Sequence, residues 1–153
     1  MTVHLQDQHF SELSNTTLIN LLRLRSEVFV VEQDCVYLDI DGRDQESTTR
    51  HIWLQDPSLP QNQQIVACLR LLTDDRLERI GRVVTAQAHR GKGYAARLLE
   101  HVLSQSSGPW MLSAQAPLEH WYERFGFQRQ GANYLEDGIP HLAMHRASPT
   151  QAG

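Results

Sequence analysis

The chain has 153 residues, of which 41% are hydrophobic and 21% charged, and its formal net charge is −4. This length favours one domain that buries a core without disulfides or metal ions, and the negative charge argues against nucleic acid as a partner. No apolar run approaches the roughly 18 residues of a membrane span, and segment 1–10 has no secretory apolar stretch, so a cytoplasmic protein is expected. Cys35 and Cys68 have no partner nearby in sequence, which disfavours a disulfide framework and a metal site.

The first half of the chain predicts strands around one amphipathic helix. Apolar residues at helical spacing run from Leu18 to Phe29, and a polar residue at 15–17 can cap this helix. Polar and acidic residues then fill segment 32–50, which contains an Asp-Gly turn. Apolar and β-branched runs predict strands at 3–5, 51–54, 65–72 and 79–85.

The most informative stretch is the glycine-rich turn Arg90-Gly91-Lys92-Gly93-Tyr94-Ala95, which joins a strand to a helix. Such a turn leaves the first N–H groups of the helix unpaired, with the positive end of the helix dipole behind them. Because glycine lacks a Cβ, an anion can approach the backbone, so the turn predicts a phosphate or pyrophosphate site. The stretch matches neither the dinucleotide fingerprint nor the P-loop pattern. The alternative is a helix cap with two solvated cations.

The second half continues as alternating strands and helices. Segment 110–115 is a nearly continuous apolar strand, which we expect to be buried on both faces. A helix starts near Pro117 and stops at Gly126, and β structure follows as far as residue 146. The order of elements predicts an α/β fold in one domain, 1–147, followed by a flexible tail at 148–153.

Two signatures resemble the GNAT N-acetyltransferase superfamily. Arg-x-x-Gly-x-Ala at 90–95 is similar to its acyl-CoA pyrophosphate loop. Trp-Tyr-Glu-Arg-Phe-Gly-Phe at 121–127 is similar to its helix end, in which a tyrosine, here Tyr122, stands four residues before the glycine of a Gly-Phe pair. Segments that resemble the ElaA-type branch of this superfamily lie at 29–33, 39–42, 113–116 and 136–141.

The resemblance implies a fold and a reaction. The fold is a mixed, mostly antiparallel sheet, flanked by helices and splayed between the strands at about 79–85 and 110–115. The reaction transfers an acetyl group from acetyl-CoA to a primary amine by direct attack in a ternary complex. Tyr122 would be the general acid that protonates the leaving thiolate; the alternative is a core aromatic whose hydroxyl is satisfied. The residues implied to bind the cofactor are Val83, Val84, Thr85, Arg90, Gly91, Lys92, Gly93, Tyr94, Ala95 and Gln115.

The acceptor side is less defined by the sequence. No carboxylate lies between Ile80 and Thr85, where many members of the superfamily carry a base, so the general base stays open, with Asp44 and Asp137 among the candidates. The acids of segment 32–46 either attract a cationic amine or form a solvated loop. The acceptor is expected to be a small-molecule or peptide amine, and superfamily members often form homodimers. The candidate substrate contacts are Glu32, Asp39, Asp41, His51, Glu136 and His141.

Two other functions fit part of the pattern. A non-catalytic acyl-CoA-binding or regulatory module on the same fold would bind the cofactor without turning over any amine. A phosphate-ligand protein of a different α/β type would bind nucleotides without the pantetheine arm, but the 121–127 signature counts against it.

Overall fold

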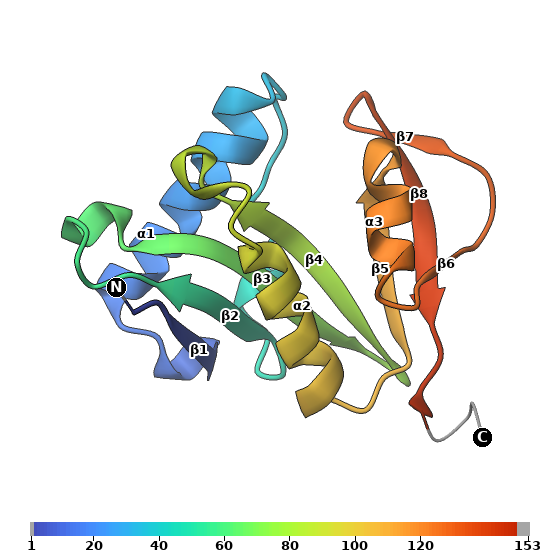
Figure 1. The fold of residues 1–153 in the computed structure, drawn as a ribbon, viewed down its shortest axis with the longest axis horizontal. Coiled ribbons are helices and arrows are strands. Elements are labelled where there is room, and N and C mark those ends of the chain that lie inside the picture. The colour runs from blue at the N-terminus through green and yellow to red at the C-terminus, as the bar shows by residue number, and fades with distance from the viewer. Residues whose placement is uncertain (1, 150–153) are drawn as a thin grey trace.

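The computed structural model describes residues 2–149, which build one mixed eight-stranded sheet with helices on both faces (Figure 1). Short 3₁₀ turns join several elements, and the first long helix continues into a π-helical turn at Ser26–Glu32. The strands and α-helices in chain order are β1 His4–His9, α1 Asn15–Arg25, β2 Arg50–Gln55, β3 Ile65–Asp74, β4 Leu77–Thr85, α2 Tyr94–Gln105, β5 Trp110–Gln115, α3 Glu119–Glu123, β6 Gln128–Arg129, β7 Tyr134–Glu136 and β8 Ile139–Arg146.

The sheet is antiparallel except at its centre. Its order is β1-β2-β3-β4-β5-β8-β6, with β7 also paired to β8, and only β4 and β5 run parallel among the described strands. Their ladder joins residues 78–80 to 110–112 and goes no further. Beyond it the two strands diverge, so the sheet opens like a V between them (Figure 1). This opening confirms the expected splay.

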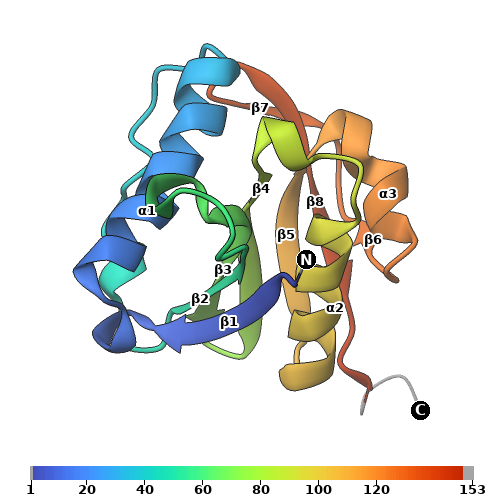
Figure 2. The same cartoon turned by 60° about the vertical axis from the view of Figure 1, so that its left-hand side comes forward.

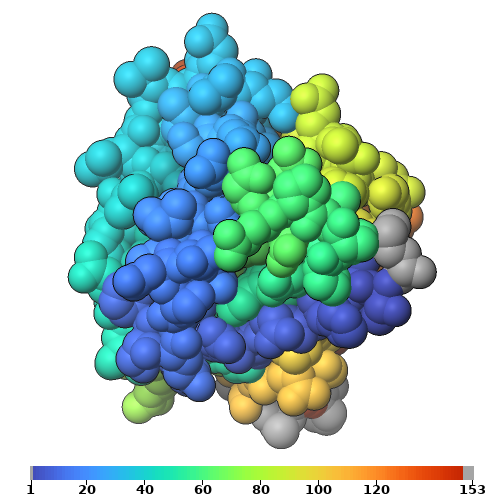
Figure 3. Space-filling view, turned by 90° about the vertical axis from the view of Figure 1, so that its left-hand side faces the viewer, coloured from blue at the N-terminus to red at the C-terminus, as the bar shows by residue number. Residues whose placement is uncertain are grey.

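Helices α1 and α2 cover opposite faces of the sheet (Figures 1 and 2), and a hydrophobic cluster lies between each helix and the sheet. In β2, Ile52 and Leu54 belong to the cluster of α2, whereas Trp53 belongs to the cluster of α1, because successive strand side chains point to opposite faces. On the side shown in Figure 3, α1 and the green connection between β2 and β3 cover the sheet. Asn20 of α1 fastens this connection by donating to the Gln61 carbonyl at 3.1 Å.

The start of α1 differs from the sequence prediction. The capping residue is Ser14, whose Oγ accepts a hydrogen bond from the Thr17 N–H at 3.1 Å, and not one of residues 15–17. These residues already have helical geometry, so their side chains lie too far along the helix to cap its first N–H groups. Similarly, α3 is a single short helix that follows a 3₁₀ turn at Ala116–Leu118, rather than one helix from Pro117.

The expectation that β5 is buried on both faces is wrong. Trp110, Leu112 and Ala114 are buried, whereas Ser113 is exposed and the pattern alternates along the strand. The cause is the splay, because a strand at the opening has one face on the core and the other toward the gap. Of the expected tail at 148–153, residues 150–153 lie outside the described part of the chain. Ser148 is buried, and its hydroxyl donates to the Ser107 carbonyl at 2.8 Å.

Candidate active site

A cleft of about 840 Å³ occupies the opening between β4 and β5. Its walls are the diverging halves of these two strands, α3, the segment at 33–41 and the hairpin of β7 and β8. One end reaches Arg90 and Ala95 at the glycine-rich turn, and the other reaches Glu136 and His141. The cleft therefore connects the two regions that the sequence singled out, which are about forty residues apart in the chain.

A β-bulge shapes the β4 wall of the cleft. The register with β3 shifts between Cys68 and Arg70, so that Arg82 and Val83 together oppose a single residue of β3. Arg82 adopts a left-handed φ of 52°, a conformation that is uncommon for residues other than glycine. A bulge re-aims the side chains around it, and here Arg82 and Val83 both line the cleft.

The glycine-rich turn has the geometry of an anion site. Gly91 and Gly93 have φ values of 81° and 76°, and a Cβ on either would meet no protein atom within 4 Å. Gly93 is the N-cap of α2 and offers no side-chain cap. Among residues 2–149, no group hydrogen-bonds the N–H groups of residues 91–96. Open N–H groups at a helix start bind anions readily.

The cations of this turn are partly occupied. The Arg90 guanidinium makes two hydrogen bonds to Glu32, at 2.7 and 2.9 Å, and these hold the pKa of Glu32 below its usual range. The Lys92 Nζ lies 3.3 Å from the His89 ring. Of the turn, only Arg90 and Ala95 line the cleft, whereas residues 91–94 lie beyond its end.

Tyr122 lies on α3 and lines the cleft with only 5% of its surface exposed. Its ring packs edge-on against Trp121 and Phe127, with centroid distances of 4.9 and 6.2 Å. No residue within 2–149 hydrogen-bonds its hydroxyl, and the hydroxyl oxygen is not fully enclosed by protein, so it is open to the cleft. Burial raises the pKa of Tyr122 to about 12, so the phenol keeps its proton at neutral pH.

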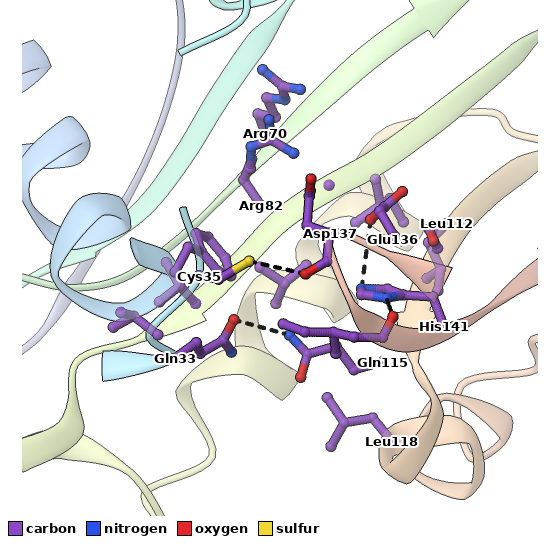
Figure 4. A pocket seen from close by; sticks show the side chains of 18 of the residues that line it. Gln33, Cys35, Arg70, Arg82, Leu112, Gln115, Leu118, Glu136, Asp137 and His141 are labelled. Atoms are coloured by element: carbon purple, nitrogen blue, oxygen red, sulfur yellow. Dashed lines mark hydrogen bonds and ion pairs between the residues drawn. The ribbon is translucent and has the colours of Figure 1, made fainter. Parts of the chain in front are cut away.

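The segment at 33–41 crosses the cleft and is tied to its far wall (Figure 4). Gln115 of β5 donates its side-chain N–H to the Gln33 amide oxygen at 3.4 Å. The Cys35 thiol donates to the Asp137 carbonyl at 3.2 Å. These two contacts link the end of the first helical stretch to β5 and to the β7–β8 turn, and they delimit the inner end of the cleft from its mouth.

His141 lies on the β8 wall of the cleft, beside Glu136 (Figure 4). It is 7% exposed, and its Nδ1 lies 2.7 Å from the Ile139 carbonyl oxygen. Its Nε2 lies 3.5 Å from a Glu136 carboxylate oxygen. The ring stacks on Tyr134 at a centroid distance of 6.2 Å and an interplanar angle of 25°, and the Tyr134 hydroxyl contacts the Ser113 hydroxyl.

The acidic segment is neither a free cation attractor nor a solvated loop. Five of its six carboxylates are ion-paired with arginines, and two of these five, Asp39 and Asp44, are buried. Hydrogen bonds from Arg70 hold the pKa of Asp41 well below its usual range, and Arg25 does the same for Asp44 against the opposing effect of burial. We call this set the arginine–aspartate network; it consists of Arg25, Arg70, Arg82, Asp39, Asp41 and Asp44.

The three arginines of this network were not singled out from the sequence. A signal was present for Arg70, which is the one charged residue in an otherwise apolar strand core, 65–72. A buried charge needs a partner, and several acids without partners lay in the segment at 32–46. Which acid pairs with which arginine depends on tertiary contacts between α1, β3 and β4, which the sequence pattern does not contain.

The predicted substrate contacts separate into two groups. Asp41, Glu136 and His141 line the cleft, together with Val83, Val84, Thr85 and Gln115 of the predicted cofactor site. Glu32 is occupied by Arg90, and Asp39 by the arginine–aspartate network. His51 is buried outside the cleft, where its Nε2 lies 3.0 Å from the Asp44 carbonyl and burial lowers its pKa.

Two features are absent from residues 2–149. No helix there has the length and apolar character needed to cross a membrane. In the same residues, no three His, Cys, Asp or Glu side chains are grouped so that they could hold a metal ion.

Comparison with known proteins agrees with this architecture. A model of the acetyltransferase (GNAT) domain matches residues 42–148. Protein ElaA of Escherichia coli (strain K12) is 44% identical over 151 residues, which span 92% of this chain and 94% of that protein. A UPF0039 protein of Mycobacterium tuberculosis is 40% identical and spans 99% of this chain and 97% of its own length. The crystal structure of an acyl-CoA N-acyltransferase from Pseudomonas aeruginosa has a TM-score of 0.88 and 39% identity, covering 95% of this chain and 100% of that chain.

Proposed function

The chain belongs to the GNAT acetyltransferase family, in its ElaA-type branch, and from this we propose that it transfers an acetyl group from acetyl-CoA to a primary amine by direct attack in a ternary complex. One observation carries the proposal. A single cleft runs from the open glycine-rich turn, past the buried Tyr122, to a mouth that carries the Glu136 carboxylate. These are the three regions that an acyl-CoA, its thioester and a cationic acceptor would need.

The cofactor would lie along β4. The open N–H groups of residues 91–96 would hold its pyrophosphate, with Lys92 supplying charge because Arg90 is occupied by Glu32. Beyond the short ladder, Val83, Val84 and Thr85 have no strand partner on the β5 side, so their edge can pair with the amides of the pantetheine arm. The side-chain N–H of Gln115 donates to Gln33, so the side-chain oxygen of Gln115 can accept a hydrogen bond from the same arm.

The chemical step would take place at the splay. A β4 backbone N–H facing the gap would polarise the thioester carbonyl as negative charge develops on its oxygen. Tyr122 would then protonate the leaving sulfur, because its hydroxyl is protonated, open to the cleft and without a partner in the described residues. The burial that raises the pKa of Tyr122 also disfavours a free thiolate, so proton transfer and C–S cleavage would be coupled.

The acceptor is proposed as a small-molecule or peptide amine. The mouth carries the Glu136 and Asp137 carboxylates, whose negative charge favours an ammonium group. A cytoplasmic location and a homodimer are also proposed; the first rests on composition and the second on the habit of the superfamily.

The test is a calorimetric titration with acetyl-CoA, CoA and ATP, followed by a screen of primary amines in which CoA release is measured. We expect acetyl-CoA and CoA to bind, ATP to bind much more weakly, and at least one amine to be acetylated. Binding of acetyl-CoA without turnover of any amine would favour the non-catalytic acyl-CoA-binding module. Equal binding of ATP would contradict the assignment of the pantetheine groove.

A further inference from the structure

We propose that His141 is the general base that takes the proton from the ammonium group of the acceptor, and that Glu136 stabilises the imidazolium that results. This inference rests on the proposed acetyltransferase function and assigns the base that the sequence leaves open. An amine needs such a base because only its neutral form can attack a thioester.

The hydrogen bond at Nδ1 sets the tautomer of His141. A carbonyl oxygen can only accept, so the 2.7 Å contact with Ile139 requires the hydrogen to be on Nδ1. In the neutral ring the lone pair is then on Nε2. Nε2 lies 3.5 Å from Glu136, too far for a good hydrogen bond but close enough for an ion pair once the ring is charged. The basic nitrogen therefore carries no hydrogen in the neutral ring, and the Glu136 carboxylate is placed to be its counterion once the ring is protonated.

Strand register places this nitrogen on the acceptor side of the splay. His141 pairs directly with Gln115 across β5 and β8, and Gln115 in turn contacts Gln33 on the α1 side of the sheet. The next residue, Leu142, points the other way and belongs to the core cluster that contains Tyr122 and the α2 side chains. Base and acid thus approach the gap from opposite faces of the sheet, so that neither side chain occupies the place of the other.

Two other groups that line the cleft, Asp41 and Cys35, are held by contacts that make them unsuitable as bases. The pKa of Asp41 is held well below its usual range by hydrogen bonds from Arg70, so this carboxylate is a weak base. The Cys35 thiol is committed to the Asp137 carbonyl. The titratable and charged side chains that line the cleft from the elements facing His141 are Tyr134, Glu136, Asp137, Cys35, Tyr37 and Arg82.

The ammonium gives one proton to Nε2 of His141, and the neutral nitrogen attacks the thioester carbon, forming the C–N bond. As the C–S bond breaks, the sulfur takes the Tyr122 proton, and the second proton of the amine nitrogen restores the phenol. The products are the acetamide, CoA with a free thiol, and a protonated His141 that releases its proton to solvent.

The experiment compares His141→Gln with His145→Gln, which lies on the same face of β8 four residues further on but outside the cleft. We measure acetyl-CoA affinity, and kcat as a function of pH with the best amine of the screen. His141→Gln should bind acetyl-CoA normally, lose about 100- to 10,000-fold in kcat near neutral pH, and recover at high pH, where the amine is already neutral. It should also lose the acidic limb of the profile, whereas His145→Gln should match the wild type.

A second measurement needs no substrate. Long-range ¹H–¹⁵N spectra of the free wild-type protein should show His141 with its hydrogen on Nδ1 at neutral pH. A hydrogen on Nε2 would overturn the proposal, as would an active His141→Gln with an unchanged pH profile. If His141→Gln does not fold, Glu136→Gln decides, because this half-exposed residue can be replaced safely; its acidic limb should move to lower pH. Wild-type protein that binds acetyl-CoA but acetylates no amine would refute the proposed function itself.

Discussion

At the scale of single residues, Tyr122 combines near-complete burial with a hydroxyl that no residue within 2–149 satisfies. Because that hydroxyl is open to the cleft, a ligand there can reach it. Tyr37 lines the same cleft but donates its hydroxyl to Asp39 at 3.0 Å. The two tyrosines therefore differ: the Tyr122 hydroxyl is available to a ligand, whereas the Tyr37 hydroxyl supports the fold.

Tyr122→Phe should lower kcat at least about tenfold and leave acetyl-CoA affinity unchanged, because it removes only the proton donor. Its stability should be equal to or above that of the wild type. Steady-state kinetics and urea unfolding measure both. The control Tyr37→Phe should instead lose about 1 kcal/mol of stability, because it removes a hydrogen bond. A wild-type kcat in Tyr122→Phe would remove this residue from the acid role.

At the scale of elements, the start of α2 is built around glycines with positive φ. Gly93 has open space around it, so a larger residue there meets backbone strain and no protein clash. Gly131 offers the same combination, with a φ of 93° and nothing within 4 Å of a Cβ, but it lies outside the cleft. A larger residue would therefore cause similar backbone strain at Gly93 and at Gly131, but only Gly93 lies beside the proposed cofactor site.

Gly93→Val should reduce acetyl-CoA affinity more than about tenfold, because its side chain would fill the space proposed for the pyrophosphate. Gly131→Val should lose a similar amount of stability through backbone strain, about 1–3 kcal/mol in unfolding experiments, and bind acetyl-CoA normally. Calorimetric titration of both variants gives the answer. Normal affinity in Gly93→Val would contradict the assignment of the turn.

The arginine–aspartate network ties the segment at 33–46 to α1, β3 and β4. Asp44 is the most enclosed of its acids and receives hydrogen bonds from Arg25 at 2.7 and 3.1 Å. Breaking a buried pair leaves a charge without its partner, which destabilises a protein far more than loss of a surface pair does.

Asp44→Asn should therefore destabilise the protein by about 3–5 kcal/mol in urea unfolding. Asp34→Asn is the matched control, because Asp34 is exposed and its φ of 50° suits asparagine. This control should stay within about 0.5 kcal/mol of the wild type. Equal losses in the two variants would show that the network contributes little.

At the scale of the whole molecule, two parts of the sheet meet at one short parallel ladder, and the cleft fills the space where they separate. The segment at 33–46 spans that space and is fixed at one side by the arginine–aspartate network and at the other by Cys35 and Gln33. The network carboxylates therefore influence both the stability of the protein and the shape of its cleft.

Stability should depend on pH in a direction set by these carboxylates. The pKa values of Asp41 and Asp44 are lower in the folded protein, so the unfolded chain binds more protons in acid. Their contribution should be complete above about pH 5 and fall as the pH drops below about 4, where the unfolded carboxylates become protonated. Thermal melts from pH 3 to 7 measure this, and Asp44→Asn should show a shallower acid decline. A stability that rises toward pH 3 would contradict it.

The sequence by itself determined what depends on near neighbours. The glycines of residues 90–95 require their own left-handed turn, and the two short motifs at 90–95 and 121–127 suffice to indicate the family. It also placed Tyr122 and His141 among the candidates, since both lie in or beside short motifs.

Only the tertiary structure decided which distant groups meet. The arginines of α1, β3 and β4 reach the acids of the segment at 33–46 because these elements pack together, and no spacing in the sequence encodes that packing. The apolar run of β5 could not reveal that one face opens on a gap, and the ring orientation of His141 depends on the Ile139 carbonyl and the β8 register. Local geometry follows from adjacent residues, whereas ion pairing, burial and proton affinity follow from contacts between residues that are distant in the sequence.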